Sequence, residues 1–276
     1  MPISENQLAV WSRQGAIDAS RRTHEAIRAA LREWDDLRNR DYEAYLQGSY
    51  KNSTNIRGSS DVDVIAQMND SFAWNRPDLP EAQQRAVDRA YEPATHSLEG
   101  FYNAVLTALR KYFGSDSVHP DNKAIKIKRG SDRLPADVVV CQQYKKFGHF
   151  RSLDDYSFVE GMKFVTRRDR RTIINYPKPH YQNGTAKNQG CSVSYKAGVR
   201  IFKNARDTMI RRAWMPSSAV PSYFLECFAY NAANHCYSGS WQSLYRAVLD
   251  DLAQGYYPDY ICQNRVRPLF GSSYDQ

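Results

Sequence analysis

The sequence predicts an α+β protein, with an N-terminal lobe built on a mixed sheet and a helical C-terminal lobe. Two observations lead to this prediction. Short apolar or alternating runs, typical of strands, are concentrated before residue 180, whereas later apolar residues have the spacing of amphipathic helices. The composition also changes near Pro177 and Pro179, which interrupt the chain. We therefore expect one lobe over residues 1–180 and a helical lobe over residues 181–276.

The composition is that of an ordinary globular protein. With 276 residues and 42% hydrophobic side chains, the chain can bury a sizeable core. No apolar run approaches the ~20 residues of a membrane span, and the N-terminal MPISENQLAV lacks the features of a secretion signal. Five dispersed cysteines without a CxxC pair indicate reduced thiols. We expect a cytoplasmic protein with no membrane partner.

The first half of the chain alternates between helical and strand patterns. Apolar residues at helical spacing predict a long helix over residues 5–43, broken or bent near Gly15, which would brace the two lobes. A strand follows from Asp61, and the polar stretch over residues 69–80 predicts a loop. Helical patterns resume at Glu81, and an amphipathic helix is predicted over residues 98–113, before Gly114.

The rest of the chain divides into strands and then helices. Alternation over residues 124–128 and an apolar run over residues 137–141 predict a hairpin. Further strands are predicted over residues 158–166 and 171–176. Beyond Pro177 we expect a loop through HYQNGTAKNQG and then helices. These helices are predicted over residues 192–214, 223–234 and 241–254.

The span QGSYKNSTNIRGSSDVD, residues 47–63, has the features of a nucleotide-handling site. Gly48 has no Cβ and is followed by the hydroxyl of Ser49, so backbone N–H groups can approach a phosphate. Asp61 and Asp63 alternate with apolar residues, which places both carboxylates on one face of a strand. Each feature alone is common in turns and strand ends. Together with Asp137, at the head of the run Val138–Val140, they predict a site for a divalent metal and a triphosphate.

The joint pattern of GS, eleven intervening residues and DVDV resembles the signature of the DNA polymerase β-like nucleotidyltransferase superfamily. Nearly the whole chain resembles, more closely, the cGAS/DncV-like family of bacterial cyclic-oligonucleotide synthases, known from anti-phage (CBASS) signalling. The resemblance rests on GSYKNSTNIRGSSDVDV, DVVVC, INYPKPHYQNGTAKN, SYKAGVRIFKNARD and PSYFLECFAYN. It implies a polymerase β-like nucleotidyltransferase lobe plus a helical lobe, with the active site in the cleft between them.

The resemblance also implies site residues and a cofactor. Asp61, Asp63 and Asp137 would be catalytic and would hold two Mg²⁺ ions, with Mn²⁺ as an alternative. The nucleotide-binding residues would be Gly48, Ser49, Lys203 and Ser222, of which the last two match positions that bind the donor triphosphate. An ammonium and a helix N-terminal serine are both suited to phosphate, although a solvated lysine and a plain N-cap remain alternatives. The implied activity joins NTPs, ATP among them, into a cyclic di- or trinucleotide second messenger with release of pyrophosphate.

The chain departs from animal cGAS in one respect. It lacks a His/Cys cluster with the spacing of the zinc insertion that grips DNA, and its basic residues are scattered. We therefore expect NTP substrates and a downstream effector reached through the product, but no obligatory DNA or RNA activator. Alternatives are a linear 2′–5′ oligonucleotide synthase, another transferase on this fold, or a non-catalytic nucleotide- or RNA-binding module. The residues leave open the bases, ring size, linkage, activating signal and oligomeric state.

Overall fold

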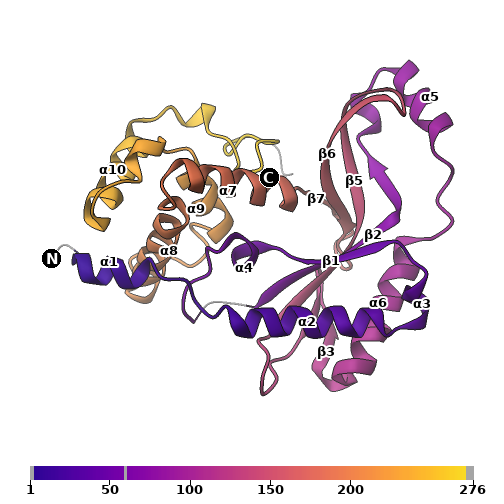
Figure 1. Ribbon diagram of the computed structural model, residues 1–276, viewed down its shortest axis with the longest axis horizontal. Coiled ribbons are helices and arrows are strands. Elements are labelled where there is room, and N and C mark those ends of the chain that lie inside the picture. The colour runs from indigo at the N-terminus through magenta and orange to yellow at the C-terminus, as the bar shows by residue number, and fades with distance from the viewer. Residues whose placement is uncertain (1–2, 59–60, 272–276) are drawn as a thin grey trace. The chain divides into compact units, whose positions relative to one another are not determined.

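The computed structural model describes residues 3–58 and 61–271. The chain forms two compact units, and neither is continuous in sequence (Figure 1). The α/β unit comprises Asp18–Gly48 and Ser60–Pro177, and the helical unit comprises Met1–Ile17, Ser49–Ser59 and Lys178–Gln276. The helical unit thus includes two segments that we expected in the first lobe. Ser59 and Ser60 of the GS…DVDV motif lie outside the described residues.

The α/β unit is built on a mixed sheet. The described residues contribute seven strands to it: β1 (Tyr42–Leu46), β2 (Val62–Trp74), β3 (Val118–Pro120), β4 (Ile125–Ile127), β5 (Ala136–Ser152), β6 (Asp155–Val165) and β7 (Thr172–Asn175). The main order is β1-β2-β5-β4-β3, and β6 joins β5 to β7. The β2–β5 pair is parallel and the other pairs are antiparallel. Because β5 is central and long, it fixes the positions of strands on both sides.

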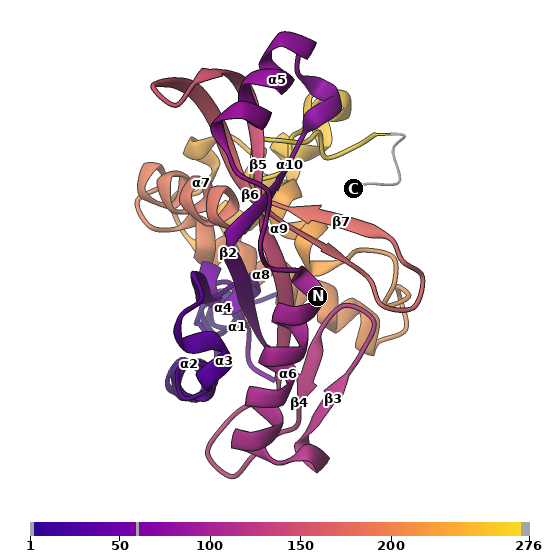
Figure 2. The ribbon, with the colours of Figure 1, turned by 90° about the vertical axis from the view of Figure 1, so that its right-hand side faces the viewer.

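Helices cover this sheet. They are α2 (Asp18–Arg32), α3 (Asp35–Arg38), α5 (Glu81–Ala90) and α6 (Leu98–Phe113). The apolar faces of α2 and α6 bury Ile27, Leu31, Phe101 and Val105, and the two helices pack against each other and against β2. Figure 2 shows α5 at one end of the long strands, where it packs on β5, and α6 near β3 at the other end.

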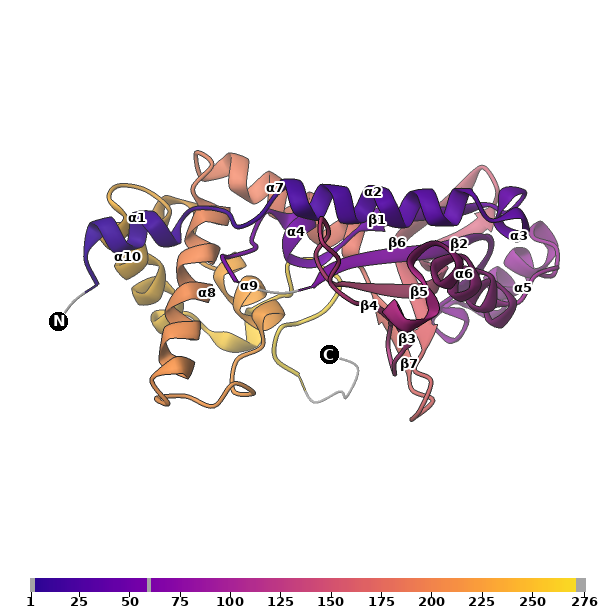
Figure 3. The same ribbon diagram turned by 90° about the horizontal axis from the view of Figure 1, so that it is seen from below.

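The central helix of the helical unit is α8 (Tyr195–Arg211). The other helices of this unit among the described residues are α1 (Glu5–Trp11), α4 (Gly48–Asn52), α7 (Pro177–Gly190), α9 (Ser222–Tyr230) and α10 (Trp241–Gln254), although the first residues of α4 and α7, Gly48 and Pro177, fall in the α/β unit. Helices α1, α9 and α10 pack against α8 (Figure 3). The core of this unit includes Tyr195, Val199, Cys227, Leu244 and Val248. None of the helices in the described residues is long and apolar enough to span a membrane.

Several predicted elements are confirmed. The helix over residues 98–113 and the helix over residues 241–254 have the predicted bounds. The hairpin of β4 and β5 pairs Lys126 with Asp137, and strands β6 and β7 lie where two further strands were predicted. The fold class is therefore correct: a mixed sheet with helices, followed by a helical region.

The single long helix over residues 5–43 is wrong. The chain breaks near Gly15, as predicted, but the described residues of this stretch form three helices, and β1 begins at Tyr42. The Gly15 amide donates to the carbonyl of Asn55 at 3.1 Å, so a tertiary contact replaces the helical hydrogen bond. As a result α1 belongs to the helical unit and α2 to the α/β unit.

Two predicted loops are also wrong, the one over residues 69–80 in its first half and the one after Pro177 over its whole length. Residues 69–74 continue β2, because the strand resumes pairing with β5 at Phe72 after an irregularity in register. Residues 177–190 form α7, whose two early prolines are compatible with a first helical turn. Asn183, in the middle of α7, donates to the carbonyl of Gln263 at 2.9 Å, so packing compensates for a weakly helical sequence.

Candidate active site

The sheet brings two of the predicted catalytic carboxylates together. Asp63 is the second residue of β2 and Asp137 the second residue of β5, and these residues are direct partners in the parallel β2–β5 register. Since side chains alternate along strands, partners in register point to the same face of the sheet. Asp61 lies two residues before Asp63 and close enough to influence the ionisation of both. The pairing arises from the apolar runs on either strand, which bury Val62, Val64, Val138 and their neighbours.

The three carboxylates repel one another. Burial, followed by the charges of Asp137 and Asp61, raises the pKa of Asp63 to about 7. Burial and Asp61 also raise the pKa of Asp137, although Lys126 acts in the opposite direction. Like charges held this close in a half-buried site favour the protonated form unless a cation neutralises them. The arrangement is therefore one that a bound cation would stabilise.

Gly48 lies directly against Asp63. It has a φ of +64°, and a Cβ at this position would come within 2.3 Å of Oδ2 of Asp63. The amide of Gln47 donates to the carbonyl of Asp63 at 3.0 Å, which fixes the approach of the turn. Only glycine satisfies both the backbone conformation and the close contact. Gly48, the first residue of the predicted phosphate-binding turn, and one predicted metal ligand are thus neighbours in the α/β unit.

The carboxylates fit a hard divalent cation whose remaining ligands come from the substrate and from water. Oδ1 of Asp137 is buried and has no hydrogen-bond partner among the described residues, so it is free to bind a metal. Within those residues, however, no group of three or more potential ligands is arranged as a complete metal cage. Mg²⁺ commonly takes one or two carboxylates and completes its octahedron with water and phosphate oxygens. The pair of Asp63 and Asp137, with Asp61 nearby, meets that requirement.

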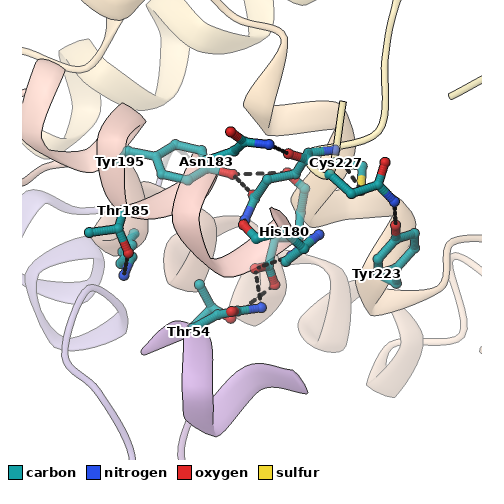
Figure 4. Close-up of polar contacts among 12 residues, drawn as sticks. Thr54, His180, Asn183, Thr185, Tyr195, Tyr223 and Cys227 are labelled. Atoms are coloured by element: carbon teal, nitrogen blue, oxygen red, sulfur yellow. Dashed lines mark hydrogen bonds and ion pairs between the residues drawn. The ribbon is translucent and has the colours of Figure 1, made fainter. Parts of the chain in front are cut away.

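A buried polar cluster organises the helical unit (Figure 4). At its centre Glu226, 4% exposed on α9, accepts from Asn52 at 3.0 Å and Thr54 at 2.9 Å. His180 of α7 and Lys203 of α8 complete it, at 3.1 and 3.0 Å from the carboxylate. Burial alone would raise the pKa of Glu226, but Lys203 and His180 hold it below its usual value. The cluster thus connects the end of α4 and the segment after it to α7, α8 and α9.

The predicted nucleotide-binding residues of the helical unit have different surroundings. Lys203 is 4% exposed, and its ammonium contacts Glu226 and, at 3.1 Å, Thr54. Ser222 is exposed at the first position of α9, where Arg206 donates to its hydroxyl at 2.9 Å. Ser49 is half-buried, and its carbonyl accepts from the amide of Thr54 at 2.9 Å. Their roles in binding nucleotide stay predictions.

The residues that surround Lys203 were not predicted from the sequence. Glu226 carried a usable signal, because it is a single carboxylate within the otherwise apolar SYFLECFAY. A buried carboxylate requires a cationic or hydrogen-bonding partner, and Lys203 was the obvious candidate on a neighbouring helix. Asn52 and Thr54 gave no such signal, since polar residues between Gly48 and Asp61 are expected in any turn.

Comparison with known proteins shows that the chain is similar to cyclic nucleotide synthases. Residues 182–276 match the family model of the cGAS/DncV-like nucleotidyltransferase C-terminal helical domain. A cyclic UMP-AMP synthase of Rhodothermus marinus is 41% identical over 276 residues, covering 100% of this chain and 92% of the relative. A cyclic nucleotide synthase of Staphylococcus haemolyticus is 35% identical, covering 100% of this chain and 93% of the relative.

Solved structures agree with these matches. The Rhodothermus marinus c-UMP-AMP synthase, solved with Apcpp and Upnpp, superimposes with a TM-score of 0.90 at 42% identity, covering 100% of this chain and 91% of that one. A cyclic dinucleotide synthase of Elizabethkingia meningoseptica, solved with GTP and Apcpp, gives a TM-score of 0.75 at 31% identity, covering 98% and 92%. The similarity therefore extends over both units of the chain.

Proposed function

Because the chain belongs to the cGAS/DncV-like nucleotidyltransferase family, we infer that it is a nucleotidyltransferase that joins two NTPs into a cyclic dinucleotide. The observation that carries this inference is the register of Asp63 with Asp137, with Asp61 two residues away. Three mutually repelling carboxylates are costly in a purely structural role. A metal-dependent transfer of nucleotidyl groups gives them a chemical purpose.

In the proposed reaction the chain's own residues position the reactants. Bound Mg²⁺ would supply charge neutralisation at the triphosphate and acidify the attacking hydroxyl. Asp61, Asp63 and Asp137 would hold it, and Asp137 would also accept the proton of the ribose hydroxyl. The hydroxyl oxygen bonds to the α-phosphorus, the bond to the bridging oxygen of the β-phosphate breaks, and pyrophosphate leaves. The turn of Gly48 and Ser49 would hold the leaving phosphates.

A second transfer closes the ring. The remaining ribose hydroxyl of the linear intermediate attacks its own 5′-triphosphate, again with loss of pyrophosphate, so that the product has no terminal phosphate. The relatives include synthases named for UMP-AMP, dipurine and dipyrimidine products, so all four NTPs are candidate substrates. Similarity to bacterial cyclic nucleotide synthases supports, as a further proposal, a cytoplasmic role in anti-phage defence through an effector that binds the product.

The proposal is tested by incubating the purified protein with four labelled NTPs and Mg²⁺. We expect pyrophosphate release and a labelled product that resists phosphatase, both abolished by EDTA and by Asp63→Asn. A product wholly sensitive to phosphatase would instead indicate a linear oligonucleotide synthase. Tight NTP binding without turnover would indicate a non-catalytic nucleotide-binding module and overturn the proposal.

A further inference from the structure

A cavity of about 660 Å³ lies in the α/β unit, at the far end of the sheet from the proposed metal site. It is lined by the last part of β2, by β5, and by α5 with the residues that follow that helix (Figure 1). β1 pairs with β2 only as far as Met68, so among the described residues no strand covers this side of the last part of β2. The volume is that of a small-molecule site, typically ~300–1,000 Å³.

The cavity is separate from the candidate active site. Lys145, which lines it, lies eight residues beyond Asp137 on β5, which is roughly 26 Å along the strand at ~3.3 Å per residue. A small molecule in the cavity therefore does not reach the groups that react in the proposed nucleotidyl transfer. Its binding is a property distinct from that function.

Three aromatic side chains, Phe72, Trp74 and Tyr91, form much of the apolar lining. The rings of Phe72 and Tyr91 meet edge to face with centroids 4.7 Å apart, and Trp74 meets Phe147 edge to face at 6.1 Å. Because each ring is held by an aromatic neighbour, the walls are ordered before a ligand arrives. Such walls favour a planar aromatic ligand, which can stack on them or meet them edge to face.

Lys145 is the only cation among the described residues that line the cavity. Its Nζ lies over the rings of Phe72 and Tyr91, at 4.0 and 5.0 Å from their centroids. In the described parts of the chain no carboxylate lies within ion-pair distance of this ammonium, although the charge of Glu160, its cross-strand partner, opposes the lowering of the Lys145 pKa by burial. The rings stabilise the charge, but the three N–H donors of the ammonium remain available to an anion.

The acidic residues of the lining are neutralised or exposed. Asp88 accepts from both Nη atoms of Arg76, at 2.6 and 2.8 Å, and Asp70 is paired with Arg40. Glu92 is exposed, so solvent and salt screen its charge. An anionic ligand on the ammonium would therefore meet little repulsion from the lining.

We propose that this cavity binds a small molecule that carries a planar aromatic ring and an anionic group. The ring packs against Phe72, Trp74 and Tyr91, and the anionic group accepts from the ammonium of Lys145. The ligand thus supplies the acceptor that the described residues do not give to Lys145. The site does not depend on the proposed function, because none of these residues belongs to the candidate active site.

Binding of 2-naphthoate, a planar ring with one carboxylate, tests this proposal. Ligand-observed NMR titrations of the full chain, without divalent metal, give its Kd. We expect Lys145→Met to weaken binding by about 10-fold or more, the usual effect of losing a charge-assisted contact. Lys146→Met is the matched control, since the next residue of β5 points to the other face of the sheet and should change affinity less than about 2-fold. Equal affinity of Lys145→Met and the native protein would overturn the proposal.

Two further measurements separate loss of the charge from loss of the fold. Lys145→Arg keeps the cation and should bind 2-naphthoate within about 3-fold of the native protein. 2-Naphthol has the ring without the carboxylate, so it should bind the native protein more weakly than 2-naphthoate does and be insensitive to Lys145→Met. Equal binding of the two probes to the native protein would contradict the role of Lys145. Displacement of 2-naphthoate by excess tripolyphosphate would mean that the probe occupies a nucleotide phosphate site, and would also overturn the proposal.

Discussion

Asp63 is the residue whose ionisation links the sheet to the proposed metal site. Burial and the neighbouring carboxylates of Asp137 and Asp61 raise its pKa to about 7, whereas an aspartate in an unfolded chain has a pKa of ~3.9. Between about pH 4 and 7 the folded protein therefore keeps a proton that the unfolded chain has released. Folding becomes less favourable as the pH rises through this window, and the whole penalty is present above about pH 7.

We therefore predict that the metal-free protein is less stable at about pH 8 than at about pH 5. The free energy of unfolding should fall by roughly 1–4 kcal/mol over this range, with about 4 kcal/mol as the limit for a shift of about three pKa units. Asp63→Asn should remove most of the fall, because an amide does not titrate. Urea unfolding in EDTA at several pH values measures this fall. An Asp63→Asn variant with the native pH dependence would contradict the assignment of the raised pKa to Asp63.

The same charges predict how Mg²⁺ acts on stability. Because the metal competes with the proton on Asp63, the rise in Tm caused by Mg²⁺ should be larger at about pH 8 than at about pH 6. Differential scanning fluorimetry with and without Mg²⁺ gives this comparison. Asp61→Asn, Asp63→Asn and Asp137→Asn should each reduce the effect. A Tm shift of the same size in these three variants and in the native protein would exclude the three residues as ligands.

Gly48 gives a prediction that separates steric conflict from backbone strain. In Gly48→Ala the new Cβ would come within 2.3 Å of the Asp63 carboxylate, in addition to the strain of a positive φ. Gly114 has a φ of +85°, but a Cβ added there would meet no atom within 4 Å, so Gly114→Ala carries the backbone strain alone, roughly 1–3 kcal/mol. We expect Gly48→Ala to lose turnover and Gly114→Ala to keep it, as measured by pyrophosphate release. Equal activity would mean that Gly48 does not shape the site.

At the scale of elements, the sequence was informative wherever local pattern and tertiary environment agreed. The helix over residues 98–113 has an N-cap at Ser97, an apolar face and Gly114 at its end, so its bounds were predictable. Asp137 was placed correctly on a strand because the apolar run after it could only be a buried strand or a short buried helix, and the turn before it favoured a strand.

The elements that were missed depend on distant residues. β2 continues through Asn69 and Asp70 because β5 is long enough to pair with it beyond the bend, and nothing within the polar stretch reports that partner. Helix α7 is stabilised by contacts with Gln263, some 80 residues later in the chain. The engagement of Lys203 is similar, because its partner Glu226 lies on another helix. Such contacts cannot be read from local periodicity.

The cluster that joins α7, α8 and α9 gives a prediction at this scale. Glu226→Ala would leave the Lys203 ammonium buried without a counter-ion, which typically costs about 3–5 kcal/mol. Glu81→Ala is the control, because it removes an exposed carboxylate paired with Arg85 on the surface of α5 and should cost under ~1 kcal/mol. Thermal and urea unfolding compare the two. A small and equal loss in both variants would show that the buried pair does not stabilise the helical unit.

At the scale of the whole molecule, the net charge bears on whether the protein requires a polynucleotide. The formal net charge of +8 favours anionic partners, and NTPs satisfy that preference without a polynucleotide. We predict turnover of NTPs in the absence of DNA and RNA, unchanged by prior nuclease treatment of the protein. Added duplex DNA should alter the rate less than about 2-fold at moderate salt, where weak charge contacts are screened. A strict requirement for polynucleotide would contradict this prediction and indicate a sensor.

The most direct test of cyclic dinucleotide synthesis is the mass of the product made by the native protein and by Asp137→Asn, side by side, with all four NTPs and Mg²⁺. We predict that the native protein yields two nucleoside monophosphate units joined in a ring. This product is lighter by one water than the linear dinucleotide that carries a 5′-monophosphate. We expect no such species from Asp137→Asn, which should remain folded by circular dichroism. A linear product carrying a 5′-triphosphate, or the cyclic product from Asp137→Asn in native amounts, would contradict this mechanism.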